Sequence, residues 1–198
     1  MKVEHLFSTP LYIEKYQKHE LVKPNLFNLL LADIKNNNTN RPDEHWKCNS
    51  YKTFVDGQFD LEIDMHLHID NYLRYLGFTS ITYKTESWFN MYGEHQYQED
   101  HNHIPSLFSG MYVLNFNEQH TPIIFRNRNP ELNAIYIEYD LQPANFPGAY
   151  QDVSVNLEEG FVYIWPGCVR HSVPPQLKID KNNYRVTFTF NVIATRLL

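Results

Sequence analysis

The chain has 198 residues, 42% of them hydrophobic and 20% charged, with a formal net charge of −6. This length fits one domain with a substantial core, and the composition argues against a chain that is disordered throughout. No long run of Lys or Arg is present to neutralise nucleic-acid phosphates, so nucleic-acid binding is not indicated.

The first part of the chain predicts a short extended segment, a helix and a loop. Residues 6–16 predict the extended segment, which Pro10 interrupts. Residues 20–36 predict a helix, and the polar stretch 36–45 predicts a loop. The helical spacing is carried by Leu26, Leu29, Leu30 and Ile34.

Residues 60–77 predict a second helix with one apolar face. Gly77 stands where a helix C-terminus favours glycine, so we expect the helix to end there. The apolar face consists of Leu61, Met65, Ile69, Tyr72, Leu73 and Leu76.

After Gly77 the pattern changes to short strand-like runs bounded by Gly, Pro and Asn. Strands behind two helices predict a mainly β fold, a double-stranded β-helix (cupin-like jelly roll) with flanking N-terminal helices. We expect a single domain over residues 1–198, with helical support at about 20–77 and the jelly-roll core at about 79–195. The predicted strands are 81–92, 108–116, 121–127, 133–141, 152–157, 161–166 and 184–193.

Two cysteines, Cys48 and Cys168, lie far apart and form no C-x-x-C pair, so no disulfide framework is expected. The N-terminal residues lack a signal-peptide apolar run. No stretch approaches the about 20 apolar residues that cross a bilayer. We therefore expect no membrane association and a reducing cytoplasm. The sequence is compatible with a homo-oligomer.

Three histidines form a candidate metal site. His101 and His103 are two positions apart, and on a strand such residues point to the same face. His171 follows a Pro-Gly turn and would approach from the far side of the barrel. Three facial protein ligands that leave positions open are typical of non-haem Fe(II) oxygenases.

The usual form of such a site has two histidines and one carboxylate, but His103 stands where the acid is expected. Glu99 and Asp100 precede His101, but Asp100 is adjacent to it in sequence and would face away on a regular strand. We therefore favour three His ligands, which gives the site one more positive charge than the usual ligand set.

The same H-x-H spacing also arises without metal binding. His66 and His68 fall within the second predicted helix, where residues two positions apart differ by about 200° and diverge. Because the chain has 10 histidines, the spacing alone leaves a structural role open for the other three as well.

Arg185 opens the last predicted strand and is a candidate anion clamp. A guanidinium offers two parallel donors to a carboxylate. Thr187 is two residues further along, hence on the same face, and can add a hydroxyl donor. Taken alone, Arg185 also fits a surface residue of an edge strand.

Five segments, spread over nearly the whole chain, carry a family resemblance: LFSTPLY, SWFNMY, HNHIPSLFSGMYVL, IWPGCVRHSVPP and RVTFTFN. Together they resemble the 2-oxoglutarate (2OG)- and Fe(II)-dependent oxygenases, and specifically a subgroup of unknown substrate found in bacteria and phages.

This resemblance implies His101, His103 and His171 as ligands of Fe(II). It implies Arg185 as the partner of the 2OG C5 carboxylate, with Thr187 as a helper. In the prolyl-hydroxylase branch of this family a tyrosine upstream of the first His contacts the cosubstrate, and Tyr92 or Asn90 could take that place.

The implied activity is that of a dioxygenase that consumes O₂, decarboxylates 2OG to succinate and hydroxylates an unknown primary substrate, such as a peptide or prolyl side chain. The implied setting is the cytoplasm of a bacterium or of a phage-infected host cell.

Two other functions fit the same residues. The first is a cupin-type dioxygenase with three His ligands that does not use 2OG, which would have no need of Arg185. The second is a non-catalytic jelly-roll binding module or virion protein, since jelly rolls host many functions.

Overall fold

A computed structural model describes residues 8–37, 51–53, 57–78, 80–127 and 152–197. Within these ranges the chain forms two helices, α1 (His19–Asn37) and α2 (Gln58–Tyr75). The strands are β1 (Tyr12–Lys15), β2 (Tyr51–Thr53), β3 (Ile81–Tyr92), β4 (Gln98–His101), β5 (Phe108–Asn115), β6 (Ile123–Arg126), β7 (Asp152–Val155), β8 (Phe161–Pro166), β9 (His171–Val173) and β10 (Arg185–Leu197).

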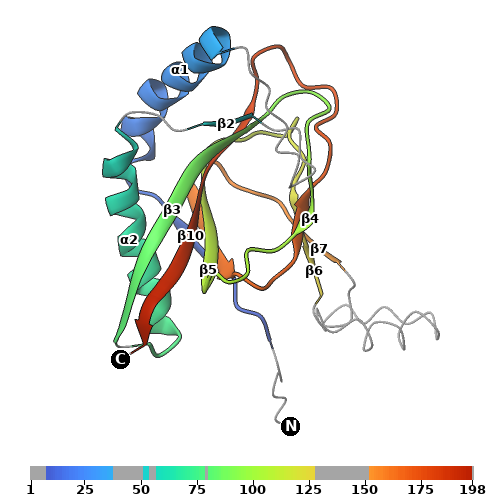
Figure 1. Ribbon diagram of the computed structural model, residues 1–198. Coiled ribbons are helices and arrows are strands. Elements are labelled where there is room, and N and C mark those ends of the chain that lie inside the picture. Colours follow the sequence, from blue (N-terminus) through green and yellow to red (C-terminus); the bar gives the residue numbers. More distant parts are fainter. Residues whose placement is uncertain (1–7, 38–50, 54–56, 79, 128–151, 198) are drawn as a thin grey trace, which may run out of the picture.

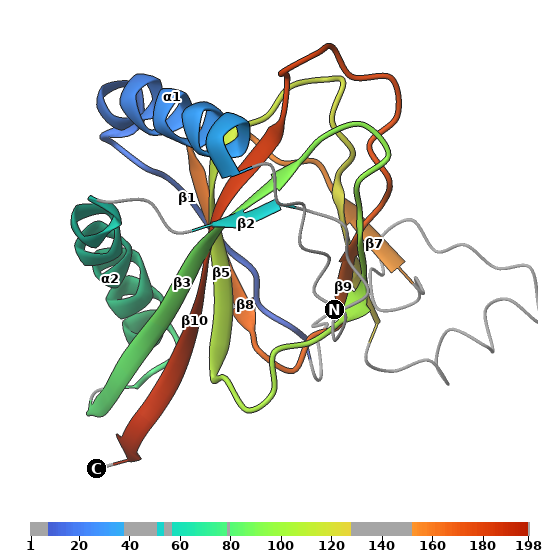
Figure 2. The same ribbon diagram turned by 45° about the horizontal axis from the view of Figure 1, so that its top comes forward.

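These strands form two antiparallel sheets. One has six strands in the order β1-β8-β5-β10-β3-β2, and the other has four in the order β4-β9-β6-β7. Both helices cover the outer face of the six-stranded sheet, and the four-stranded sheet stands across from its inner face (Figures 1 and 2). The predicted double-stranded β-helix with flanking N-terminal helices is confirmed.

Alternating strand residues divide the apolar side chains between two cores. On β8, Val162 and Ile164 join the core beneath the helices, whereas Tyr163 and Trp165 join the core between the sheets. The apolar face of α2 is buried as predicted, but Leu29 of α1 is 49% exposed, so the predicted face of that helix is too wide.

The end of α2 shows how a glycine terminates a helix. Gly77 has a φ of 84°, a conformation that side chains with a Cβ rarely adopt. Its N–H donates to the Arg74 carbonyl at 3.0 Å, and the next N–H, of Phe78, donates to Leu73 at 2.9 Å. These bonds satisfy carbonyls that the helix leaves open and turn the chain toward β3.

The long strands lie close to their predicted positions, but β2, β4 and β9 were not predicted. β4 has the sequence QEDH, and β2 and β9 have three residues each, so none carries an apolar alternation.

The predicted strand 133–141 and Cys48 lie outside the described residues, and Cys168 is a half-buried free thiol. In the described part of the chain, no helix is both long and apolar enough to cross a membrane.

Candidate metal centre

Two of the three candidate ligands lie side by side on neighbouring strands of the four-stranded sheet. His101 at the end of β4 pairs with His171 at the start of β9, and their ring centroids are 4.4 Å apart. The Nδ1 of His101 donates to the Glu99 carbonyl at 2.8 Å, and that of His171 donates to Val169 at 3.1 Å. With the proton on Nδ1, the lone pair of each ring lies on Nε2, the arrangement of a metal-binding imidazole.

His103 reaches the same place from a loop. The sequence predicts that His101 and His103 share one strand, but β4 ends at His101, so that local prediction is wrong. The loop is held by its backbone: His103 N–H donates to Gly167 at 2.8 Å, and Ser106 N–H donates to His103 at 2.7 Å. The His103 ring centroid is thereby 4.9 Å from that of His101 and 5.1 Å from that of His171.

The three rings offer ligand atoms that all lie within 4.8 Å of one another. Burial keeps them neutral: it lowers the pKa of His101, lowers that of His103 to about 3, and lowers that of His171 well below its usual value. The mutual repulsion of charged rings adds to this effect at His103 and His171. Three neutral imidazoles with converging lone pairs are suited to a divalent transition metal.

The neighbouring acid is engaged elsewhere. Asp100 accepts a hydrogen bond from Arg170 Nε at 2.7 Å, and its carbonyl accepts another from the same guanidinium at 3.0 Å. Arg170 directly precedes His171, and Asp100 directly precedes His101. The ion pair therefore ties together the segments that carry the candidate ligands His101 and His171, and the Asp100 carboxylate is not among the clustered candidate ligand atoms.

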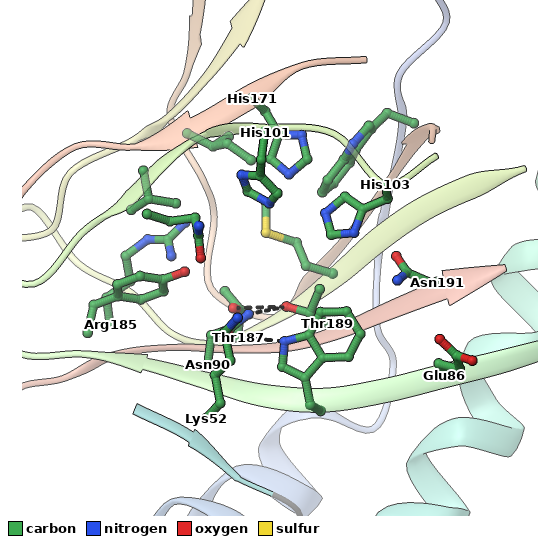
Figure 3. Close-up of a pocket in the computed structure, with 17 residues that line it drawn as sticks. Lys52, Glu86, Asn90, His101, His103, His171, Arg185, Thr187, Thr189 and Asn191 are labelled. Atoms are coloured by element: carbon green, nitrogen blue, oxygen red, sulfur yellow. Dashed lines mark hydrogen bonds between the residues drawn. The ribbon is translucent and has the colours of Figure 1, made fainter. Parts of the chain in front are cut away.

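A pocket of about 260 Å³ opens beside the three histidines. Its floor is formed by alternate residues of the adjacent strands β3 and β10, which is why every second side chain enters it. From β10 these include Arg185 and Thr187, which lie opposite Tyr92 and Asn90 of β3. All four predicted cosubstrate residues therefore line this pocket (Figure 3).

Arg185 lies at one end of the pocket and is only 1% exposed. Its Nε and Nη2 have no hydrogen-bond partner, and burial lowers the pKa of the guanidinium. The Tyr92 ring packs against it, 5.1 Å from ring centroid to Cζ. A buried cation with open donors is costly unless an anion joins it, so this end of the pocket fits a carboxylate.

The residues beside the clamp form a hydrogen-bonded floor. Asn90 accepts from Trp88 Nε1 at 3.1 Å and donates to Thr189 Oγ1 at 2.9 Å, so both ends of its amide are held. The hydroxyls of Thr187 and Thr189 are 3.4 Å apart. Asn90 therefore supports the pocket floor through the hydrogen bonds of its side chain. Thr187 lies next to Arg185 in the pocket, as strand alternation predicts.

Sequence reasoning did not single out Glu86, Asn191 or Lys52, which also line the pocket. The alternation that places Arg185 inward also carries Glu86 and Asn191 inward, so the signal was present on β3 and β10. Lys52 lies on the three-residue strand β2 and had no such signal.

The second H-x-H pair is elsewhere, as its helical spacing predicts. His66 Nδ1 lies 3.0 Å from the Tyr83 hydroxyl, and His68 Nδ1 lies 3.1 Å from the Tyr12 hydroxyl. Both are bound to tyrosines around α2 and belong to no metal cluster in the described ranges.

Residues 86–191, more than half of the chain, match the family described as "Putative 2OG-Fe(II) oxygenase". No curated protein matches the chain.

Solved structures with the same fold include a prolyl-4-hydroxylase of Pseudomonas putida, with 12% identity, a TM-score of 0.63, and 94% of this chain and 93% of that chain covered. The viral collagen prolyl hydroxylase of Paramecium Bursaria Chlorella virus-1, in its 2OG complex, has 14% identity, a TM-score of 0.55 and coverages of 91% and 95%. HygX of Streptomyces hygroscopicus, with nickel and 2OG bound, has 11% identity, a TM-score of 0.58 and coverages of 94% and 83%.

Proposed function

Since the chain belongs to the 2OG-Fe(II) oxygenase family, we propose that His101, His103 and His171 hold its iron and that Arg185 binds the C5 carboxylate of 2OG. Thr187 assists Arg185, with Tyr92 and Asn90 completing the cosubstrate end of the pocket. The chain is an enzyme that uses Fe(II), 2OG and O₂. The ligand set and the residue roles are our proposal.

The observation that carries the proposal is the combination of two complementary sites in one pocket. Ligand atoms of three neutral histidines lie within 4.8 Å of one another, and a guanidinium with open buried donors lines the same cavity. A molecule that chelates a metal at one end and carries a carboxylate at the other satisfies both, and 2OG is such a molecule.

When bound, iron with 2OG supplies the oxidising power for hydroxylation of a C–H bond, with O₂ consumed and 2OG decarboxylated to succinate. The chain's own residues bind and orient the iron and 2OG, and they exclude water from the pocket. The Arg185 guanidinium fixes the distal end of the cosubstrate, and the Asp100–Arg170 ion pair keeps His101 and His171 in register. The apolar walls include Met111 and Ile123.

A cupin-type dioxygenase without 2OG would need the three histidines but not a buried cation with open donors. A non-catalytic jelly roll would need neither. The Arg185 environment favours the 2OG-dependent reaction over both. We further propose that the enzyme hydroxylates a peptide substrate and that residues 1–198 form a single domain. Its proposed location is the cytoplasm of a bacterium or of a phage-infected cell.

The proposal is tested by succinate release from purified protein given Fe(II), 2OG and O₂ without a primary substrate. The wild type should release succinate slowly, and His171→Ala should abolish this release because one of three ligands is lost. An unchanged rate in His171→Ala would show that the reaction occurs without this metal site. If Arg185→Met still releases succinate at the wild-type rate at a low 2OG concentration, Arg185 does not bind the 2OG carboxylate.

A further inference from the structure

We propose that the end of the pocket opposite Arg185 recognises the primary substrate through a protonated amine or guanidinium, which pairs with Glu86. The same end presents hydrogen-bond donors to an oxygen of that substrate. This inference rests on the proposed function, because it assigns the part of the pocket that the cosubstrate does not use.

The strands place four residues in one row across the six-stranded sheet. Trp165 of β8 pairs with Ser109 of β5, Ser109 pairs with Asn191 of β10, and Asn191 pairs with Glu86 of β3. Asn191 follows Arg185 by six positions on one strand, which is about 20 Å at the usual rise per residue. Figure 3 shows Glu86 and Asn191 together at the end away from Arg185.

The inner part of this row offers donors. Trp165 is only 2% exposed and lines the pocket, yet its Nε1–H has no hydrogen-bond partner. Asn191 Oδ1 accepts from Ser109 Oγ at 2.8 Å, which leaves the N–H groups of its amide for the pocket. Because a buried donor without a partner is costly, an oxygen atom of a ligand is the expected partner of the indole.

The outer part of the row is acidic. Among the described residues that line the pocket, Glu86 has the sole carboxylate, and its side chain is 57% exposed. Lys84 lies 3.7 Å away, but it is equally exposed, and such surface pairs are weak. The Glu86 carboxylate therefore stays accessible to a cation that enters from solvent.

A second charge restricts where that cation can bind. Lys52 lies opposite Asn90 in the β2–β3 pairing and lines the same pocket. Lys52 thus repels a substrate cation from the middle of the pocket, so the row containing Glu86 is the position that attracts one.

The size of the pocket limits what enters. Its volume of about 260 Å³ is below the roughly 300–1,000 Å³ of typical ligand sites. Because 2OG would take up part of this volume, the pocket favours a substrate group the size of a side chain. Trp88 lies between Asn90 and Glu86 on β3 and offers an aromatic face to an alkyl stem. A lysine or arginine side chain, within a peptide or as the free amino acid, has this chemistry.

The test is a calorimetric titration of wild-type protein loaded with Zn²⁺ and 2OG, which binds without turnover. The probes are acetyl-glycyl-lysyl-glycinamide and its arginine analogue, the matched Nε-acetyllysine and citrulline peptides, and free lysine and arginine. We expect the charged peptides to bind at least about tenfold more tightly than their neutral matches, the effect of a charge-assisted hydrogen bond. Tighter binding of free lysine or arginine than of the peptides would identify a free amino acid as the substrate. Equal affinities of charged and neutral probes, or no binding, would overturn the proposal.

Variants locate the effect. Glu86→Gln should remove the preference for charged probes, Glu86→Lys should reverse it, and the distant exposed Glu118→Gln should keep it. Trp165→Phe should weaken charged and neutral probes alike, leaving their ratio intact. A preference that survives Glu86→Gln would contradict the assignment.

The two proposals fail in different ways. Succinate release without a charge preference would refute only the inference about the substrate. A charge preference in the zinc-loaded protein without any succinate release from the iron-loaded protein would refute only the proposed function.

Discussion

His101 lies directly opposite His171 in the pairing of β4 with β9, with 4.4 Å between their ring centroids. Two imidazoles at this separation in a buried setting disfavour protonation of both, so they favour a shared external cation. The third ring, His103, is added by a loop rather than by the sheet. The candidate site therefore has two rings placed by strand pairing and a third ring whose position depends on the loop.

The first prediction concerns pH and the metal-free protein. Burial lowers the pKa of His103 to about 3 and lowers that of His171 well below its ordinary value, against about 6.5 in an unfolded chain. Between these values only the unfolded state binds protons, so the stability present above about pH 6.5 is lost as the pH falls. The expected slope is up to about 1.4 kcal/mol per pH unit for each histidine.

Urea unfolding of the metal-free wild type and of His103→Gln at pH 7.5, 6 and 5 measures this slope. Burial also lowers the pKa of His68 and His120, and both proteins retain that contribution. The variant should therefore lose part of the slope. Identical slopes in the two proteins would show that His103 titrates normally in the folded state.

The second prediction concerns the charge of the ligand set. His103→Asp would replace a neutral ligand with an anion, which stabilises Fe(III) more than Fe(II). The reduction potential of the bound iron should fall by at least about 60 mV, equivalent to a tenfold change in relative affinity. Spectroelectrochemical titration measures it. A potential equal to that of the wild type would mean that residue 103 does not contact the metal.

The third prediction separates stability from cosubstrate binding at Arg185. Because its Nε and Nη2 are buried without partners, Arg185→Met should raise the free energy of unfolding of the ligand-free protein by about 1–3 kcal/mol. The same change should weaken 2OG binding by about 30-fold or more.

Thermal unfolding with and without 2OG reports both effects in one experiment. Arg74→Met on the surface of α2 is the matched control and should behave like the wild type. A variant that is destabilised without 2OG, yet is still stabilised by 2OG, would contradict the role assigned to Arg185.

The fourth prediction concerns the support of the His103 loop. A Cβ on Gly167 would overlap the backbone carbonyl of Ser106, and Gly167 itself bonds the His103 and Leu107 backbones. Gly167→Ala should therefore cost about 1–3 kcal/mol of stability and weaken metal binding. Gly93→Ala meets mainly the Tyr184 ring at 3.1 Å and is the control. Unchanged zinc affinity in Gly167→Ala would show that the loop does not depend on this contact.

Much of this architecture can be predicted from the sequence, because side chains along a long strand with one buried face alternate with a period of two residues. The runs that became β3, β5, β8 and β10 show it, and on β10 it places Arg185 and Thr187 on one face. The candidate Arg185 also stands out in the sequence, because an arginine is almost never fully buried unless it is paired.

What the sequence does not show is how short polar segments are arranged by their neighbours. Lys52 enters the pocket because β2 pairs with β3, a contact that three residues cannot encode. His103 lies close to His101 and His171 because its loop is tied to Gly167, not because it shares a strand with His101. The open indole donor of Trp165 depends on what surrounds it and is visible only in three dimensions.

The most direct test of the account is a crystal structure of the protein with Mn²⁺ and 2OG, with the metal located by anomalous scattering. We predict one metal peak bound by His101, His103 and His171, with the distal carboxylate of 2OG on the Arg185 guanidinium. A metal bound elsewhere, or a 2OG molecule oriented away from Arg185, would contradict it.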